Sequence, residues 1–203
     1  MKHCIKLVVC LFLIACNSKG KRSLVGESEY QIAQNAIFKD ASKSPLKKKD
    51  LKNFKGLDFF PVDSNFIVTG KFTKIENAPV FEMSTTTDRK PLYKEYGTVE
   101  FQINNVACKL TIYQNQDDLN SEEYKDYLFL PFTDDTSGES SYGGGRYMDI
   151  MTYDIKADST VVLNFNNTYN PYCAYNEKYS CPLTPRKNHL NVAITAGIKT
   201  FKK

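Results

Sequence analysis

Polar side chains gather between residues 133 and 185, and they include most of the residues in this chain that could do chemistry. Gly143-Gly144-Gly145 would let the backbone approach a ligand closely, and Arg146 beside it offers a fixed cationic fork. Together they suggest a cradle for a small anion, although the run lacks the GxxxxGK[ST] phosphate-loop pattern and no clear helix follows it. The alternative is that the glycines form a bend between two strands, and that Arg146 forms an ion pair with Asp149 or Asp134.

Carboxylates in this region could supply acid–base chemistry. Asp134, Asp135 and Glu139 could transfer protons or ligate a cation, and a solvated acidic loop is the plainer alternative. A hydrolase would need Asp134, Asp149 and Arg146 to converge on a substrate. The sequence offers no recognisable nucleophile–base pair beside them, and this favours binding over catalysis.

Tyrosines and asparagines in the same region could hold a sugar. Amides suit sugar hydroxyls, and the rings of Tyr142, Tyr147, Tyr169 and Tyr175 suit sugar faces, although irregular loops use such residues to satisfy backbone groups. The expected partner is therefore a small anionic or sugar-like ligand, and no cofactor is expected. The candidate ligand-binding residues are Asp134, Tyr142, Gly143, Gly144, Gly145, Arg146, Asp149, Tyr169 and Asn170.

Three of the six cysteines, Cys108, Cys173 and Cys181, follow the N-terminal leader, by which we mean residues 1–16. An odd number allows at most one internal disulfide, and Cys173 with Cys181 would close a short loop, so this pair is the candidate disulfide. A buried pair of thiols is the alternative. Two thiolates lack the four ligands of a closed zinc site, so no metal site is predicted. A nucleophilic cysteine would need a nearby histidine, and His189 is the one that follows the leader.

The first residues are typical of a lipoprotein signal peptide. Lys2 and Lys6 give a basic start, and residues 7–15 form an apolar run too short to span a bilayer. Leu13-Ile14-Ala15-Cys16 resembles the lipobox of bacterial lipoproteins, in which the cysteine is acylated. We therefore expect a signal peptide at residues 1–15, lipidation of Cys16, and a flexible tether at residues 16–28. The lipid bilayer is then a partner, because several acyl chains on one cysteine anchor a protein stably.

The residues after Cys16 bear on the membrane and on other partners. Asn17 is not the Asp of the simple inner-membrane retention signal, so we expect an outer-membrane anchor facing the periplasm. Five of the 27 Lys and Arg residues precede Leu24 and all 23 Asp and Glu follow it, so the body carries 22 basic and 23 acidic residues. This balance and the lack of a basic stripe exclude nucleic acid as a partner.

Helical periodicity is confined to the start of the body. Tyr30, Ala33 and Ile37 share one face and predict a helix over residues 29–41 with Ser28 as its cap, followed by a short helical turn over residues 47–54. From residue 57 onward the pattern is β, with Asn104-Asn105 as a tight hairpin. Strand-like segments are predicted at 65–74, 79–83, 92–96, 97–103, 106–114, 128–132, 147–153, 160–165 and 190–201.

These elements predict a mainly β fold and one domain over residues 29–203. Short strands with closely spaced turn signals suggest a single antiparallel β-sandwich or partly open barrel, preceded by one or two short N-terminal helices. No βαβ alternation is present. The polar residues of the 133–185 region would then lie on loops and strand ends.

Three blocks in a fixed order resemble a bacterial family, the domain-of-unknown-function family 1684. They read FLPFTDDTSGESSYGGGRYMDI, then NFNNTYNPYCAY, then SCPLTP followed by Asn188. The family carries an LFLPF–D–TSG–YGGGRY–D block, an FN–AYNPPCAY block and a CPLPPPEN block, and Tyr172 stands here in place of its second Pro. The similarity reaches from residue 41 to residue 201. It implies a β-rich single domain and brings no assigned activity.

Two functions are consistent with these features. The first is a lipid-anchored envelope protein that binds a ligand or maintains the envelope. The alternative is a periplasmic hydrolase-like enzyme that uses Asp and Arg chemistry in the YGGGRYxD block, which runs from Tyr142 to Asp149.

Overall fold

A computed structural model describes residues 26–202 of the chain. The expected signal peptide at 1–15, the lipidation site Cys16 and the tether up to residue 25 lie outside the described residues. Within residues 26–202, no helix is both long enough and apolar enough to cross a membrane.

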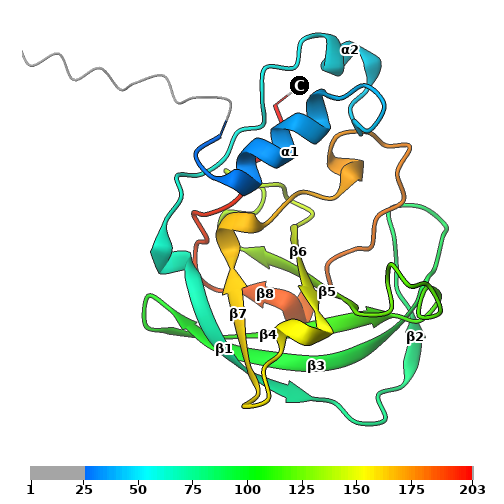
Figure 1. Cartoon of the computed structure of the whole chain (residues 1–203), viewed down its shortest axis with the longest axis vertical. Coiled ribbons are helices and arrows are strands. Elements are labelled where there is room, and N and C mark those ends of the chain that lie inside the picture. Colours follow the sequence, from blue (N-terminus) through cyan, green and yellow to red (C-terminus); the bar gives the residue numbers. More distant parts are fainter. Residues whose placement is uncertain (1–25, 203) are drawn as a thin grey trace, which may run out of the picture.

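Two short helices precede the sheet, as the sequence predicted. The Ser28 side chain accepts a hydrogen bond from the Gln31 N–H at 3.3 Å and caps α1 (Glu29–Lys39). The helix ends two residues earlier than expected because the backbone of Asp40 is extended. α2 (Lys48–Lys52) is the predicted helical turn. Both helices lie at one end of the sheet, near the C-terminus (Figure 1).

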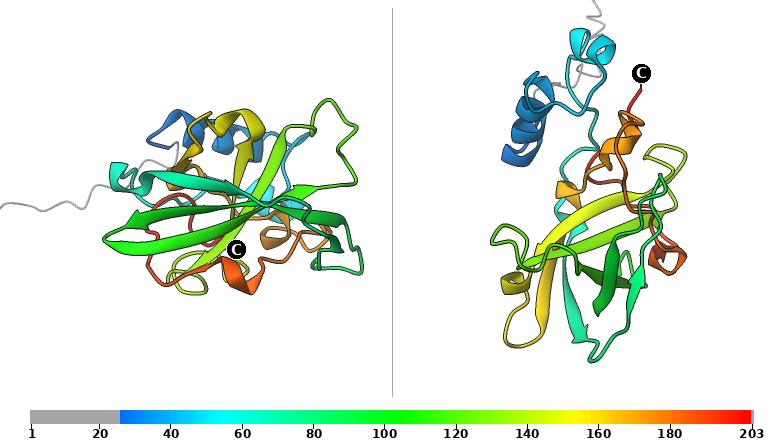
Figure 2. Two further views of the ribbon diagram at one scale, coloured as in Figure 1. Left: turned by 90° about the horizontal axis from the view of Figure 1, so that it is seen from below. Right: turned by 90° about the vertical axis from the view of Figure 1, so that its right-hand side faces the viewer.

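The body is an open, strongly curled antiparallel sheet that forms a half-barrel (Figures 1 and 2). Its strand order is β6-β5-β4-β3-β1-β7, with β2 added to β3 and a short parallel contact of β8 with β5. Of the two predicted architectures, this is the partly open barrel. The strands are β1 (Ile67–Lys74), β2 (Val80–Glu82), β3 (Leu92–Ile103), β4 (Val106–Asn115), β5 (Tyr127–Asp134), β6 (Arg146–Met151), β7 (Thr160–Asn164) and β8 (His189–Leu190).

The long strand β3 changes which face its side chains occupy. The sequence predicted two strands here, and the structure has one strand with a bulge between Glu95 and Gly97. Because the extra residue shifts the two-residue alternation, Tyr93 points to one face of the sheet while Val99 and Phe101 point to the other. The predicted hairpin between β3 and β4 is present, with positive φ at Asn104 and Asn105.

The two faces of the sheet bury different side chains. One face holds the main core, with Leu110, Ile112, Leu130 and Phe132 among its fully buried residues. The opposite face of β3, β4, β5 and β6 carries an aromatic cluster instead. Its buried members are Met83, Tyr93, Tyr113, Phe129 and Tyr147. The second face is therefore rich in hydroxyl groups that sit beside aromatic rings.

Asn188 completes the sheet where a proline interrupts it. β4 and β5 pair at Tyr113 and Phe129, and the next pair along would join Thr111 to Pro131, which has no N–H to donate. The Asn188 side chain inserts there. Its Nδ2 donates to the carbonyls of Thr111 (2.8 Å) and Pro131 (2.7 Å), and its Oδ1 accepts from the Thr111 N–H (2.9 Å).

The predicted strand at 190–201 was wrong beyond β8. The carbonyls of Ile194, Ala196 and Ile198 accept hydrogen bonds from the Arg146 guanidinium rather than from a neighbouring strand. Gly197 adopts φ +74°, a conformation that a strand cannot continue through. The C-terminal segment therefore crosses the end of the half-barrel outside the sheet.

The Asn188 contacts generate a stability prediction. Asn188→Leu removes three hydrogen bonds and leaves buried backbone groups unsatisfied, so the free energy of unfolding should fall by about 2–4 kcal/mol. Urea denaturation of the full chain measures this. Asn120→Leu is the matched control, since Asn120 is exposed, and it should leave the unfolding free energy nearly unchanged. Equal stability of the two variants would contradict the bridging role of Asn188.

Candidate functional site

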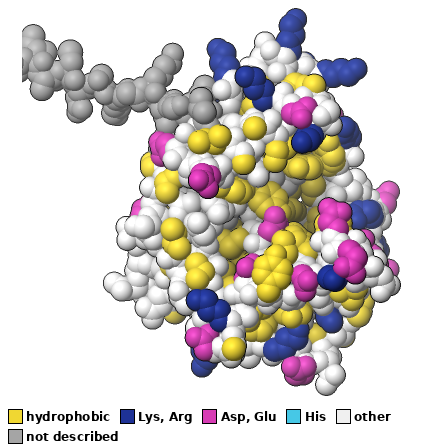
Figure 3. Space-filling model, viewed as in Figure 1, with side chains coloured by type: hydrophobic (Ala, Val, Ile, Leu, Met, Phe, Trp, Pro, Cys, Tyr) yellow, Lys and Arg dark blue, Asp and Glu magenta, His cyan; other side chains and the backbone are white. Residues whose placement is uncertain are grey.

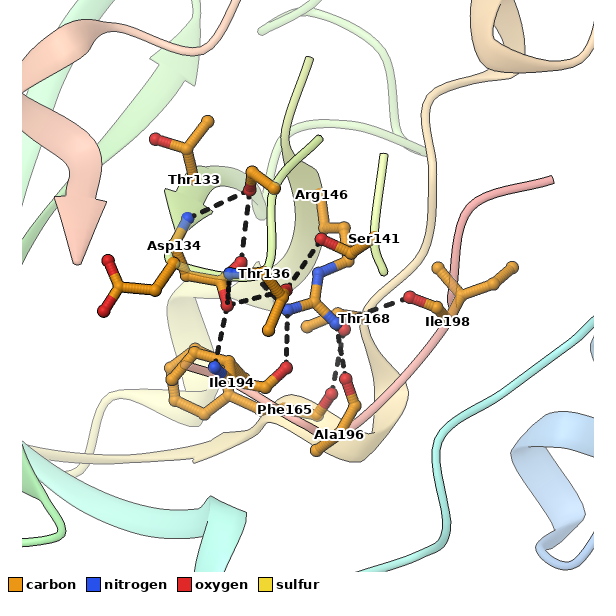
Figure 4. Close-up of polar contacts among 12 residues, drawn as sticks. Thr133, Asp134, Thr136, Ser141, Arg146, Phe165, Thr168, Ile194, Ala196 and Ile198 are labelled. Carbon is orange, nitrogen blue, oxygen red and sulfur yellow. Dashed lines mark hydrogen bonds and ion pairs between the residues drawn. The ribbon is translucent and has the colours of Figure 1, made fainter. Parts of the chain in front are cut away.

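Arg146 and Asp134, both predicted to bind ligand, form a closed ion pair inside the protein (Figure 4). Their side chains are 0% exposed, and Arg146 Nη2 lies 3.2 Å from Asp134 Oδ1. The guanidinium also donates to three carbonyls of the 194–198 segment and lies 5.2 Å from the ring centroid of Phe132. Burial lowers the pKa of Arg146, and the charge of Asp134 opposes this effect.

Asp134 is saturated by donors from the protein. Its Oδ2 accepts from the Ile194 N–H at 2.7 Å and from the Thr136 hydroxyl at 2.8 Å, and its Oδ1 accepts from the Ser137 hydroxyl at 3.2 Å. Figure 4 shows Thr136 and Ile194 beside the carboxylate of Asp134. Neither charge of the pair reaches solvent, so the pair has a structural role and offers no site for a ligand anion.

The glycine run forms a turn that leads into β6. Gly145 has φ +93°, and a Cβ there would lie 2.6 Å from the carbonyl oxygen of Phe132, so this position needs glycine. Gly143 and Gly144 are exposed on the turn. The three glycines therefore form a bend between strands, which was the alternative to an anion cradle. Arg146, the next residue, points into the protein interior.

A pocket of about 590 Å³ opens on the aromatic face of the sheet, below α1. Figure 3 shows this hollow, with hydrophobic side chains in its wall and acidic side chains within and beside it. We call it the tyrosine pocket. Its lining residues are Tyr30, Gln34, Tyr93, Tyr127, Phe129, Tyr147, Met148, Asp149, Asn167, Tyr169, Pro171, Tyr172, Tyr179, Ser180, Cys181 and Pro182.

Side chains that point to the same face of β5 and β6 form one wall of the tyrosine pocket. Phe129 of β5 lies directly opposite Asp149 of β6, and the next residues on the same face are Tyr127 and Tyr147. Tyr93 of β3 adds to this wall, and the remaining wall comes from α1 and from residues 167–172 and 179–182. The sheet fixes Asp149, and the helix and loop enclose it.

Asp149 is held at one oxygen and open at the other. The hydroxyls of Tyr127 (2.8 Å) and Tyr169 both donate to its Oδ1, and no hydrogen bond from the described residues reaches Oδ2. Asp149 itself is exposed toward the pocket. Burial and the charge of Asp149 raise the pKa values of Tyr127 and Tyr169 well above the ordinary range, so both remain neutral donors.

Tyr30 brings an unsatisfied hydroxyl into the same pocket. Its oxygen is shielded from solvent and has no hydrogen-bond partner among the described residues. Burial, and after it the charge of Asp149, raise the pKa of Tyr30. A buried polar atom without a partner costs free energy. A ligand in the tyrosine pocket could satisfy this hydroxyl.

The other predicted site residues lie elsewhere. Asn170 is buried, and its Nδ2 donates to the Lys199 carbonyl at 2.9 Å. Tyr142 contacts Cys173, and Tyr175 is buried against Phe38 of α1. Of the nine candidate residues, the structure therefore brings only Asp149 and Tyr169 into the tyrosine pocket.

Sequence reasoning missed six aromatic residues that line the pocket. Two of them, Tyr172 and Tyr179, follow residue 167, and the other four are Tyr30, Tyr93, Tyr127 and Phe129. Each of these four belongs to a helix or strand, whereas the residues predicted for the site were expected on loops and strand ends. Alternation of side chains along residues 127–132 was a usable signal, because it sets Tyr127 and Phe129 apart from the core residues between them.

Cys173 and Cys181 are neighbouring free thiols, so the candidate disulfide is not formed in this structure. The Cys173 N–H donates to Cys181 Sγ at 3.2 Å. This arrangement corresponds to the alternative given above, in which the two cysteines are a pair of thiols. Cys108 is separate and lies in β4.

Comparison with known proteins identifies the family. The model of the proteins of unknown function called DUF1684 matches residues 52–199. The chain belongs to the DUF1684 family. The resemblance seen in the sequence is thereby confirmed. A search of curated proteins finds no match to this DUF1684 chain.

A solved structure shares the DUF1684 chain's fold. The solution NMR structure of an uncharacterized protein of Haloarcula marismortui is similar to it with a TM-score of 0.65 and 31% sequence identity. The similarity covers 84% of this chain and 90% of that protein. The strand wall of the tyrosine pocket falls within the DUF1684 match, whereas Tyr30 and Gln34 of α1 precede it.

The buried ion pair gives a second stability prediction. Arg146→Met leaves the Asp134 carboxylate buried without its cation, so the unfolding free energy should fall by about 3–5 kcal/mol. The double variant with Asp134→Asn should recover part of this loss, because it removes the isolated charge. Chemical denaturation measures both.

The matched control for this prediction is an exposed pair on the same sheet. Lys109→Met removes the cation that lies 2.8 Å from Glu100 at the surface, and it should hardly alter stability. If Arg146→Met were as stable as Lys109→Met, the structural role assigned to the Arg146–Asp134 pair would be wrong.

Proposed function

We propose that this DUF1684 protein is a lipid-anchored binding module of the cell envelope that holds a small organic cation in the tyrosine pocket. One observation carries the proposal. Asp149 is the only charged side chain that lines the pocket within the described part of the chain, and seven tyrosines surround it. A carboxylate among aromatic rings is a general arrangement for recognising an organic ammonium group.

The energetics favour this ligand class. Aromatic faces attract a cation by about 0.5–2 kcal/mol each, and more as the cation is desolvated. Asp149 Oδ1 already accepts two tyrosine hydroxyls, and Oδ2 is free to face a ligand charge. The hydroxyl of Tyr30 adds an acceptor at the helix side of the pocket. A ligand with a positive centre and a hydrogen-bonding arm would satisfy all three features.

An anionic ligand is less well supported than the sequence suggested. Arg146, the expected anion-binding residue, is enclosed by protein acceptors, and no Lys or Arg lines the pocket among residues 26–202. The hydrolase alternative loses support for the same reason, because Asp134 and Arg146 lie apart from the solvent-facing Asp149.

A neutral sugar-like ligand is the second candidate. The amides of Gln34 and Asn167 line the tyrosine pocket and could hydrogen-bond hydroxyl groups. Aromatic rings also pack against sugar faces. A sugar would not require the charge of Asp149, and this difference separates the two candidates experimentally.

The anchor part of the proposal comes from the leader sequence. Cys16 follows an apolar segment in a lipobox-like order, and the residues after it lack the inner-membrane retention Asp. We place the protein at the outer membrane, facing the periplasm, with the tether up to residue 28 connecting the lipid to α1.

Choline and its neutral carbon analogue, 3,3-dimethyl-1-butanol, test the ligand class. We expect choline to bind the full chain in isothermal titration calorimetry and the neutral analogue to bind at least tenfold more weakly, because only choline gains from the charge of Asp149 and from the rings. Asp149→Asn should weaken choline binding at least tenfold. A factor of ten corresponds to about 1.4 kcal/mol.

Asp135→Asn is the control for this experiment, since Asp135 is an exposed carboxylate outside the tyrosine pocket. It should leave choline binding unchanged. Binding of a methyl glycoside that survives Asp149→Asn would favour the sugar-like candidate instead. Binding of small anions but not of choline would refute the cation proposal.

The anchor is tested separately by Cys16→Ser. The variant lacks the thiol that accepts the lipid, so it should not incorporate labelled fatty acid and should leave the membrane fraction. Metabolic labelling and fractionation measure both. A Cys16→Ser protein that stays lipidated in the membrane would show that the lipobox interpretation is wrong.

A further inference from the structure

Cys173 and Cys181 lie together at the rim of the tyrosine pocket, and Cys181 forms part of its wall. A 3₁₀ turn at Tyr172–Ala174 presents Cys173. Cys181 is fixed on the other side by Thr86, whose N–H donates to the Cys181 carbonyl at 2.9 Å and whose Oγ1 accepts from the Cys181 N–H at 3.1 Å. Two separate segments therefore position this pair of thiols.

The environments of the two sulfur atoms differ. Cys173 is partly exposed, whereas Cys181 is 6% exposed. A hydrogen bond from Cys181, helped by Thr86 and Tyr142 and opposed by burial, lowers the pKa of Cys173 to about 7. The same hydrogen bond, together with burial, raises the pKa of Cys181. Cys173 is thus the more acidic and more accessible thiol, and Cys181 is the protonated neighbour.

Cys108 offers an internal comparison. It lies in β4, where burial raises the pKa of its thiol. Its Sγ is 3.5 Å from the Val106 carbonyl, and it is a buried free thiol. A thiol in this setting packs as a small apolar group.

We propose that Cys173 and Cys181 form a dithiol–disulfide couple that reduces small disulfides, with Cys173 as the attacking thiol and Cys181 as the resolving thiol. The Cys173 thiolate attacks one sulfur of a disulfide RS–SR, forms a mixed disulfide and expels one RS⁻. Cys181 then loses its proton and attacks the Cys173 sulfur, which expels the second RS⁻. Each RS⁻ takes up one proton, so the two cysteines are oxidised by two electrons and RS–SR becomes two RSH.

The test uses the full chain in mild detergent with its three leader cysteines replaced, as Cys4→Ser, Cys10→Ser and Cys16→Ser. The reduced protein is mixed with bis(2-hydroxyethyl) disulfide and followed by intact mass and thiol release. This probe is neutral, so the result does not depend on the proposed cation site. The expected product has lost two hydrogens and has released two small thiols per chain.

Single variants separate the two roles. Cys181→Ser should stop at the mixed disulfide on Cys173 and keep the mass of one half of the probe. Cys173→Ser should react at least tenfold more slowly, and Cys108→Ser should behave as the parent chain does. A thermal melt shows that each variant is folded. In the parent chain, alkylation of Cys173 by iodoacetamide should reach half its maximal rate near pH 7, because the thiolate reacts.

Three results would overturn the proposal. Cys173 could react no faster than Cys108 does. The purified protein could hold a Cys173–Cys181 bond that dithiothreitol reduces only after unfolding, which would make the bond structural. Finally, both thiols could be bound to a copurified metal ion.

Discussion

The rest of the structure depends on a charge pair that water does not reach. Asp134 ends β5 and Arg146 begins β6, so their contact closes the base of the polar loop between the two strands. The same guanidinium gathers three carbonyls from the C-terminal segment. A buried guanidinium is tolerable only when acceptors surround it, and this requirement fixes the loop, the glycine turn and the C-terminus relative to one another.

The opposite face of the same strands carries the tyrosine pocket. Alternation along β5 and β6 turns Phe132 and Leu130 into the core and turns Phe129 and Asp149 out of it. The bulge in β3 adds Tyr93 to that second face. The position of the tyrosine pocket is therefore a consequence of sheet geometry, and polar residues of the loop surround the buried ion pair instead.

Part of the candidate site could be read from the sequence, and part could not. Asp149 and Tyr169 were predicted from their residue types. They are 20 residues apart in the sequence, and the Tyr169 hydroxyl donates a hydrogen bond to the Asp149 carboxylate. For Arg146 the sequence left open a ligand site or a pairing with Asp149 or Asp134. The structure pairs it with Asp134 in the interior, because burial depends on which strands pair. Tyr30 comes from a helix more than 100 residues away from Asp149, and no local pattern connects the two.

The sequence by itself determined the elements with local causes: the capped helix α1, the Asn104-Asn105 hairpin, the alternating strands and the membership in the DUF1684 family. Only the tertiary structure decided that the segment after Leu190 crosses the half-barrel outside the sheet, because its carbonyls are satisfied by Arg146. It also decided that Cys173 and Cys181 meet at a pocket. Both outcomes depend on long-range contacts, whose partners are set by packing and not by neighbours along the chain.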